Sequence, residues 1–249
     1  MLRERLRIME RYDRQIRFFG VEGQRKLMKS SVMIAGIGGL GSLAAIYVVM
    51  AGIGKVLLVD KGKVELSNLN RQILYSPNDI GKIKVKIAER KLKELNPEVK
   101  IEGIHLELNE DNVFDLVKEV DLVIDGMDNY KARFAINKAC IAENKIFIHG
   151  AVHGMVGQMM TIIPRKGPCL RCILPEEPPT FEIIPIVNSI PAVIASLEVT
   201  ETIKVLTGIG EPAIGKLIIY DGESMKFYEI KVKRKNNCID CGEQLRSVT

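Results

Sequence analysis

The stretch "VMIAGIGGLGSLAAIYVVMAGIGKVLLVD", from Val32 to Asp60, decides the fold class of this chain. A glycine-rich loop with the pattern Gly-x-Gly-Gly-x-Gly lies between two apolar runs, and the second run ends on an acidic residue. The runs at 31–35 and 55–59 are predicted to be strands, with a helix at 40–51 between them. A glycine loop between a strand and a helix presents backbone amides to phosphate groups. The stretch therefore predicts a nucleotide site, although the loop alone suits a dinucleotide and ATP equally.

The alternation of strand and helix continues to about residue 150, which is typical of a doubly wound, mostly parallel sheet. Further strands are predicted at 100–106, 121–126 and 145–149, and further helices at 83–95 and 130–143. Past residue 150, "GQMMTIIP" and "KLIIYDGESMKFYEIKV" are typical of antiparallel hairpin strands, and 193–206 is typical of a helix. The segment 174–192 is predicted to be an irregular crossover, because its prolines forbid regular helix. We expect an α/β, Rossmann-like fold with an antiparallel C-terminal extension.

The length and composition fit one soluble domain. Its predicted parts are a helical segment at about 1–29, a nucleotide-binding half at about 30–150 and a substrate and zinc half at about 151–249. The chain is 47% hydrophobic and 27% charged, with a net charge of +5 and no basic patch interleaved with aromatics, which argues against nucleic acid as a partner. No apolar run reaches the roughly 18 residues of a membrane span. The charged N-terminus lacks the apolar core of a secretory signal, so we expect a cytoplasmic protein.

The residues after Asp60 distinguish the two nucleotide ligands. A dinucleotide site needs little beyond the acid for the ribose hydroxyls, whereas here five polar side chains follow at the same sheet edge: Ser67, Asn68, Asn70, Arg71 and Gln72. Arg71 offers a planar fork for phosphate oxygens. Lys84 is a candidate second cation and Asp128 a candidate Mg²⁺ ligand. The alternatives are that Lys84 is one more solvated lysine and that Asp128 caps the following helix. Together these residues favour a triphosphate.

Four of the five cysteines form two Cys-x-x-Cys pairs, Cys169 with Cys172 and Cys238 with Cys241. Two such pairs predict a four-thiolate structural zinc site, which here would tie a mid-chain loop to the C-terminal tail. Disulfides and redox catalysis are the alternatives, but a reducing compartment and the lack of a thioredoxin-like context disfavour them. The fifth cysteine, Cys140, lies within a predicted helix and is expected to pack in the core.

Several motifs occur in the order seen in one known family. They are "RYDRQI", "GIGGLGS", "LVDKGKVELSNLNRQ", "GKIKVKIA", "DGMDN", "CLRC" and "CIDC". In these motifs the chain resembles the ThiF/MoeB/HesA family, the bacterial and archaeal relatives of ubiquitin-activating (E1) enzymes. The resemblance runs from about Arg11 to Cys241.

The resemblance implies that ATP is bound by the glycine loop (Gly38, Gly39 and Gly41), Asp60, Ser67–Arg71, Lys84, Asp128 and Asn129. Arg14 would reach the ATP of a partner subunit, which implies a homodimer. The implied reaction joins a carboxylate to AMP and releases pyrophosphate. Arg14, Arg71, Lys84 and a Mg²⁺ near Asp128 would then spread the charge that develops on the phosphates.

The chain departs from the family pattern in two places. Many members carry a further cysteine in the crossover loop, but residues 175–191 contain none, which disfavours covalent transfer through a loop cysteine. The turn "HGAVHGMVGQ" has Gly154 and Val156 where sulfur-carrier activators tend to have Arg and Glu. His149 and His153 are therefore candidates for the substrate pocket, the alternative being two histidines with structural roles at a strand end.

The acyl substrate stays open between two kinds. One is the C-terminus of a ubiquitin-like sulfur carrier, and the other is a small-molecule carboxylate such as the pyridinol carboxylate of [Fe]-hydrogenase cofactor assembly. A non-catalytic E1-like adaptor and an NAD-dependent oxidoreductase are the alternatives from other functional classes.

Overall fold

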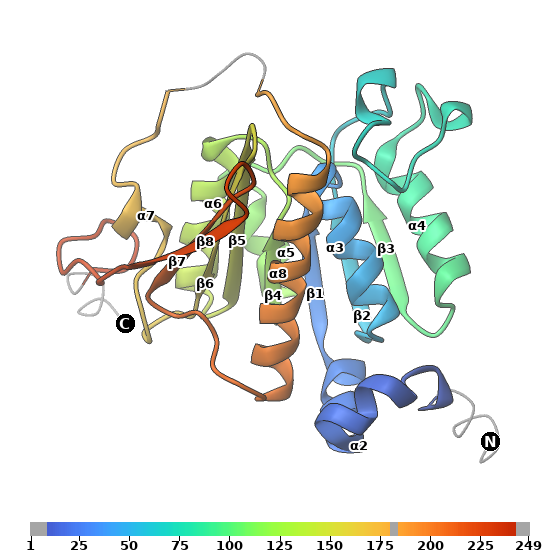
Figure 1. Cartoon of the computed structure of the whole chain (residues 1–249), viewed down its shortest axis with the longest axis horizontal. Coiled ribbons are helices and arrows are strands. Elements are labelled where there is room, and N and C mark those ends of the chain that lie inside the picture. Colours follow the sequence, from blue (N-terminus) through green and yellow to red (C-terminus); the bar gives the residue numbers. More distant parts are fainter. Residues whose placement is uncertain (1–8, 180–183, 243–249) are drawn as a thin grey trace.

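The computed structural model describes residues 9–179 and 184–242. Within them the chain forms a single sheet of eight strands (Figure 1). Their order is β3-β2-β1-β4-β5-β6-β7-β8. The bounds are β1 Ser31–Ala35, β2 Lys55–Val59, β3 Lys100–Ile104, β4 Leu122–Asp125, β5 Ile146–His153, β6 Val156–Ile162, β7 Lys216–Asp221 and β8 Lys226–Lys231. Neighbours among β1 to β5 pair in parallel, and β5 to β8 pair antiparallel. This confirms the predicted Rossmann-like sheet with an antiparallel extension.

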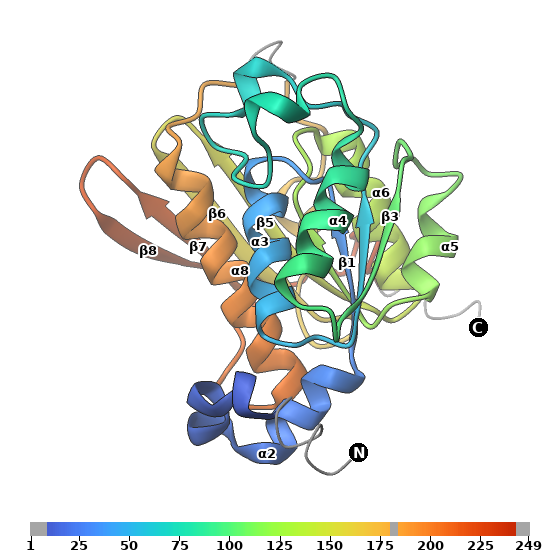
Figure 2. The same ribbon diagram turned by 90° about the vertical axis from the view of Figure 1, so that its right-hand side faces the viewer.

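Helices cover both faces of the sheet. The first face carries α3 Gly39–Met50, α4 Lys84–Leu95 and α8 Ser189–Thr207, and the other carries α5 Val113–Lys118 and α6 Tyr130–Ala142 (Figures 1 and 2). Each side has its own apolar core. The remaining elements are α2 Asp13–Lys29, the 3-10 turns η1 Leu66–Asn68 and η2 Pro77–Asp79, and α7 Leu170–Ile173. Among the described helices, none combines the length and apolar character needed to cross a membrane.

The chain reverses direction across the sheet at β1. It builds β2 and β3 on one side of β1, then returns to build β4 and β5 on the other. The loops after β1 and β4 start side by side and then lead to helices on opposite faces of the sheet, α3 and α6. Ligands of such sheets bind in the crevice between these loops. The glycines are required here because the backbones meet: a Cβ on Gly41 would lie 1.8 Å from the Gly36 carbonyl oxygen, and one on Gly36 would lie 2.6 Å from that of Gly126.

Two elements differ from their predicted bounds by four residues at one end, and the other predicted strands and helices agree to within two residues. Helix α8 begins at Ser189, four residues before the predicted start, because Pro191 lies in its first turn, where a proline removes no helical hydrogen bond. Strand β5 extends to His153 because it pairs antiparallel with β6 across a tight turn. The short helix α7 was not predicted. Of the predicted crossover 174–192, residues 180–183 lie outside the described residues.

Candidate functional site

A cavity of about 460 Å³ lies at the carboxyl ends of the parallel strands, where the chain reverses direction. Its wall is built by the loops after β1, β2, β3 and β4, the first turn of α6 and the crossover before α8. Eight of the predicted ATP-binding residues line it: Gly38, Gly39, Asp60, Arg71, Gln72, Lys84, Asp128 and Asn129. One cavity thus brings together the glycine loop, the acid at the end of β2, Arg71 and Lys84.

Four predicted ATP-binding residues do not line this cavity: Gly41, Ser67, Asn68 and Asn70. Their contacts show what they do instead. Arg71 Nη1 donates to the Ser67 carbonyl and to Asn70 Oδ1, both at 2.9 Å, so these two residues orient the guanidinium. Asn68 is buried, and its Oδ1 accepts from the Glu65 backbone N–H at 3.1 Å, which shapes η1. Through these contacts Ser67, Asn68 and Asn70 support Arg71 and η1.

Asp60 joins two loops of the cavity. Its Oδ2 accepts from the backbone N–H of Ile37 at 2.7 Å, and its Oδ1 accepts from that of Gly62 at 2.6 Å. A carboxylate oxygen accepts more than one hydrogen bond. Asp60 can therefore hold the glycine loop against the end of β2 and still accept from a ligand hydroxyl.

Positive charge dominates the cavity wall. Five cations line it (Lys61, Arg71, Lys84, Lys131 and Arg133) against three carboxylates (Asp60, Glu107 and Asp128). Lys61 pairs with Glu107 at 2.6 Å. Within the described part of the chain, the ammonium groups of Lys84 and Lys131 form no ion pair or side-chain hydrogen bond. Lys131 also lies in the first turn of α6, where the helix dipole disfavours a cation. Such a wall attracts a polyanion.

The capping role considered for Asp128 is filled by the next residue in the chain. The cap of α6 is Asn129, whose Oδ1 accepts from the Ala132 backbone N–H at 2.9 Å. Asp128 is exposed on the cavity wall, where its Oδ1 accepts from Asn129 Nδ2 at 3.2 Å. Its carboxylate is thus presented to the cavity and fits the oxygen donors that Mg²⁺ prefers.

A buried polar group that sequence reasoning missed lies next to the cavity. Asp125, at the end of β4, is fully buried, and its Oδ2 accepts from Arg133 Nε at 3.0 Å and from His149 Nδ1 at 2.7 Å. Its Oδ1 accepts from the Met127 backbone N–H at 3.0 Å. Arg133 Nη2 donates to the carbonyls of Met127, at 2.5 Å, and Gly150, at 3.3 Å. The sequence carries one signal for this ion pair, which is an acid at the end of a predicted strand (Asp125) followed by an arginine in the next predicted helix (Arg133).

The two histidines that are candidates for the substrate pocket do not line this cavity. His149 is fully buried, outside the cavity wall, with Gln158 Nε2 at 3.0 Å from its Nε2. Burial lowers the pKa of His149, which favours the neutral ring, and in that ring an amide that donates to Nε2 leaves the proton on Nδ1, toward Asp125. His153 is exposed at the end of β5 and does not line the cavity either.

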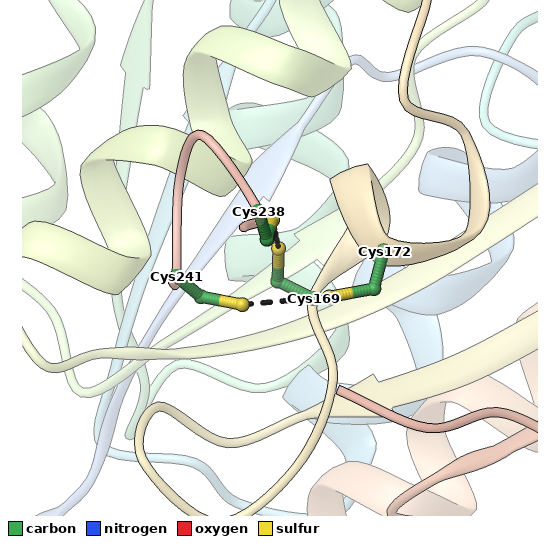
Figure 3. A group of neighbouring side chains, drawn as sticks. All are labelled: Cys169, Cys172, Cys238 and Cys241. Carbon is green, nitrogen blue, oxygen red and sulfur yellow. Dashed lines mark hydrogen bonds between the residues drawn. The ribbon is translucent and has the colours of Figure 1, made fainter. Parts of the chain in front are cut away.

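The two cysteine pairs converge in space (Figure 3). All four sulfurs lie within 4.8 Å of one another and are buried, and the Cys169–Cys238 and Cys172–Cys241 sulfurs are each 3.5 Å apart. Sulfurs at tetrahedral positions about 2.3 Å from a zinc ion are about 3.8 Å apart. The cluster therefore fits the predicted zinc ion.

Helix α6 holds both arms of the cysteine cluster. Asn137 Oδ1 accepts from the Leu170 backbone N–H at 2.9 Å, and its Nδ2 donates to Asp240 Oδ2 at 2.6 Å. The same helix carries Cys140, which is fully buried as predicted, and burial raises the pKa of its thiol.

Comparison with known proteins agrees with this geometry. The chain is 36% identical over 248 residues to the sulfur carrier protein adenylyltransferase of Thermus thermophilus, covering 95% of this chain and 92% of that protein. It is 36% identical over 241 residues to the adenylyltransferase and sulfurtransferase MOCS3-1 of Zea mays, covering 94% of this chain but only 52% of that longer protein. The crystal structure of Escherichia coli MccB with ATP superposes with a TM-score of 0.83 at 26% identity, covering 93% of this chain and 73% of that one.

A family model matches nearly the whole chain. The match runs over residues 12–241 and includes the glycine loop, the cavity wall and both cysteine pairs. It confirms the resemblance seen in the motifs, and the chain therefore belongs to the ThiF family.

Proposed function

We propose that this protein is an ATP-dependent adenylyltransferase, which joins a substrate carboxylate to AMP and releases pyrophosphate. The observation that carries the proposal is the cationic cavity, which Arg71, Lys84 and Asp128 all line. The names of its relatives support the same activity. A non-catalytic adaptor would not need these three side chains together, and a dinucleotide site would not need this many cations.

The cavity residues divide the work of binding ATP. The glycine loop offers backbone amides to the phosphates, and Asp60 accepts from the ribose. Arg71 and Lys84 pair with phosphate oxygens. Gln72 is buried on the wall, and its Oε1 has no hydrogen-bond partner among the described residues, so it is available to the nucleotide. Asp128 would hold a Mg²⁺, which supplies further neutralising charge to the phosphates.

The chemical step needs charge stabilisation more than proton transfer. A carboxylate oxygen attacks the α-phosphorus, and the bond from that phosphorus to the pyrophosphate oxygen breaks. The attacking group is already deprotonated at neutral pH, so no general base is required. Negative charge accumulates on the phosphates in the transition state, and fixed cations there lower the barrier. Arg71 and Lys84 fill this role from within the chain.

For the acyl substrate, the first candidate is the C-terminal carboxylate of a ubiquitin-like sulfur carrier. The full-length relative that is named for such a carrier supports it. The second is a small-molecule carboxylate such as the pyridinol carboxylate of [Fe]-hydrogenase cofactor assembly. The absence of a cysteine from 175–191 and the residues Gly154 and Val156 in the β5–β6 turn favour this second kind.

Arg14 acts on the site of a second subunit in this proposal. It is exposed on α2, which lies at the opposite end of the sheet from the cavity (Figure 1), and it does not line the cavity of its own chain. Large apolar side chains are exposed on α2 and α3, including Phe18, Tyr47 and Met50. Such a surface suits a homodimer. Four reduced thiols around zinc suit a reducing compartment such as the cytoplasm.

A carboxylate-dependent ATP–pyrophosphate exchange assay tests the proposal. Candidate carriers and small acids are compared in parallel, and calorimetry compares ATP with NAD. We expect ATP binding, no NAD binding and exchange with one class of carboxylate. ATP binding without exchange for any carboxylate would favour the adaptor, and NAD binding would favour the oxidoreductase.

A further inference from the structure

Asp128 owes its position to a single peptide group. The Met127 carbonyl belongs to the peptide bond that joins Met127 to Asp128, and Arg133 Nη2 donates to this carbonyl. The Met127 N–H donates to Asp125 Oδ1 at 3.0 Å. One buried ion pair therefore fixes both backbone groups of the residue that precedes the candidate Mg²⁺ ligand.

We propose that Arg133 is a positioning residue of the nucleotide site, whose guanidinium, oriented by Asp125 and His149, fixes the Met127–Asp128 peptide and thereby the Asp128 carboxylate. The inference rests on the proposed function, in that Asp128 is taken to bind the Mg²⁺ of ATP. Arg133 is 5% exposed, and its guanidinium carbon lies 5.0 Å from the centre of the Tyr130 ring. The side chain is thus enclosed and directed at the turn rather than at solvent.

The arrangement requires the shape of a guanidinium. Arg133 Nε donates to Asp125 Oδ2, while Nη2 donates to two backbone carbonyls, that of Met127 in the loop after β4 and that of Gly150 within β5. The planar fork makes these contacts with a fixed spacing between its nitrogens. A lysine has one nitrogen on a flexible stem and cannot make all of them with the same geometry.

His149 fixes the other half of the ion pair. Its Nδ1 is 2.7 Å from the same Asp125 oxygen that Arg133 Nε contacts, and Gln158 holds the opposite ring nitrogen. The carboxylate is therefore held by a backbone N–H, a guanidinium and an imidazole. His149 therefore contributes to the site through Asp125 and does not line the cavity itself.

The test uses Mg²⁺ dependence, which a purely structural role would not change selectively. ATP binding to the whole protein is measured by calorimetry across a Mg²⁺ titration and again with EDTA. For Arg133→Lys, which keeps the positive charge at this position of the wall, we expect the half-saturating Mg²⁺ concentration to rise about tenfold, as for one lost hydrogen bond to a charged group, and the dissociation constant of metal-free ATP to rise by a clearly smaller factor. Lys138→Ala is the matched control, since Lys138 is an exposed cation on the same helix that pairs only at 3.7 Å with Glu110.

A second variant keeps the test decisive if Arg133→Lys does not fold. His149→Gln keeps the main ion pair, and we expect a smaller rise in the half-saturating Mg²⁺ concentration, about threefold, because the hydrogen bond that is lost acts on Asp128 only through Asp125. A folded variant of either kind with the Mg²⁺ dependence of Lys138→Ala would overturn the inference and leave the proposed function standing. Failure of the wild-type protein to bind ATP would overturn both.

Discussion

Glu198 gives the sharpest prediction for stability. This residue of α8 is fully buried, and within the described residues neither of its carboxyl oxygens has a hydrogen-bond partner. It packs against β5 so closely that a Cβ on Gly150 would lie 2.4 Å from Glu198 Oε1. Burial raises the pKa of Glu198 well above its ordinary value, and the charge of Asp125 raises it further. The folded protein therefore keeps this carboxyl protonated in a pH range where the unfolded chain has ionised it.

The sign and size of the effect follow from proton linkage. Above the ordinary pKa of a glutamate, the folded state binds one more proton than the unfolded state, so the free energy of unfolding falls as pH rises. The loss is about 1.4 kcal/mol per pH unit until the folded-state pKa is reached. Over two pH units the loss is about 2.8 kcal/mol, which is a large part of the free energy of unfolding of a typical domain, about 5–15 kcal/mol. Glu198→Gln has no such proton and should lose none of this stability.

Urea denaturation of both proteins at a series of pH values measures the effect. We expect the stability of Glu198→Gln relative to wild type to grow by about 1.4 kcal/mol per pH unit. His149 has the opposite dependence, because its lowered pKa makes stability fall as pH drops below its ordinary value of 6.5. The contribution of His149 is the same in both proteins, so it cancels when the free energies of unfolding of wild type and Glu198→Gln are subtracted. A constant difference across the series would refute the reasoning.

Four further predictions concern the site and the metal. Arg71→Ala and Asp128→Ala should each reduce pyrophosphate exchange by roughly 10²-fold or more while the circular dichroism spectrum is kept; normal exchange by both would place the ATP site elsewhere. Metal analysis should find about one Zn²⁺ per chain. Cys172→Ser should clearly lower the melting temperature of the protein and have only a small effect on its turnover at saturating ATP, because the metal stabilises the fold and takes no part in the reaction. A mixture of Arg14→Ala and Arg71→Ala should recover partial exchange activity if Arg14 acts across a dimer, and a mixture as inactive as its parts would contradict that. Cys140→Ala should keep substantial activity, because a buried thiol with a raised pKa is a poor nucleophile, and mass spectrometry that trapped a thioester on Cys140 would restore a covalent mechanism.

The parts of the molecule that local patterns specify were predictable from sequence. The β1 loop and α3 carry their own periodicity and glycine spacing, and the acid at the end of β2 follows directly. The cysteine pairs were also predictable, since zinc sites use two such pairs. The sequence predicts the start of α8 four residues too late, because its prolines argue against helix although a proline in the first turn is compatible with one.

The parts that depend on distant contacts were not predictable. Nothing local to His149 shows that its ring points at Asp125, 24 residues earlier, rather than into a cavity. The polar run after Asp60 has the same ambiguity, because Arg71 lines the cavity whereas Ser67 and Asn70 do not line it and accept hydrogen bonds from the Arg71 guanidinium. Sequence locates the polar residues at the correct sheet edge but does not tell which of them face the ligand.

Helix α6 explains how the nucleotide half and the cysteine cluster form one unit, although the sequence changes character near residue 150. Its N-terminal cap, Asn129, lies on the cavity wall, and Arg133, one turn further on, joins the end of β4 to Gly150 on β5. Another turn on, Asn137 contacts both arms of the cluster. Three successive turns of one helix thus connect the β4 turn, the start of the antiparallel extension and the C-terminal tail. Because each of these contacts of Arg133 and Asn137 is a buried hydrogen bond that costs free energy if left unmade, α6 is held in place both at the β4 turn and at the C-terminal tail.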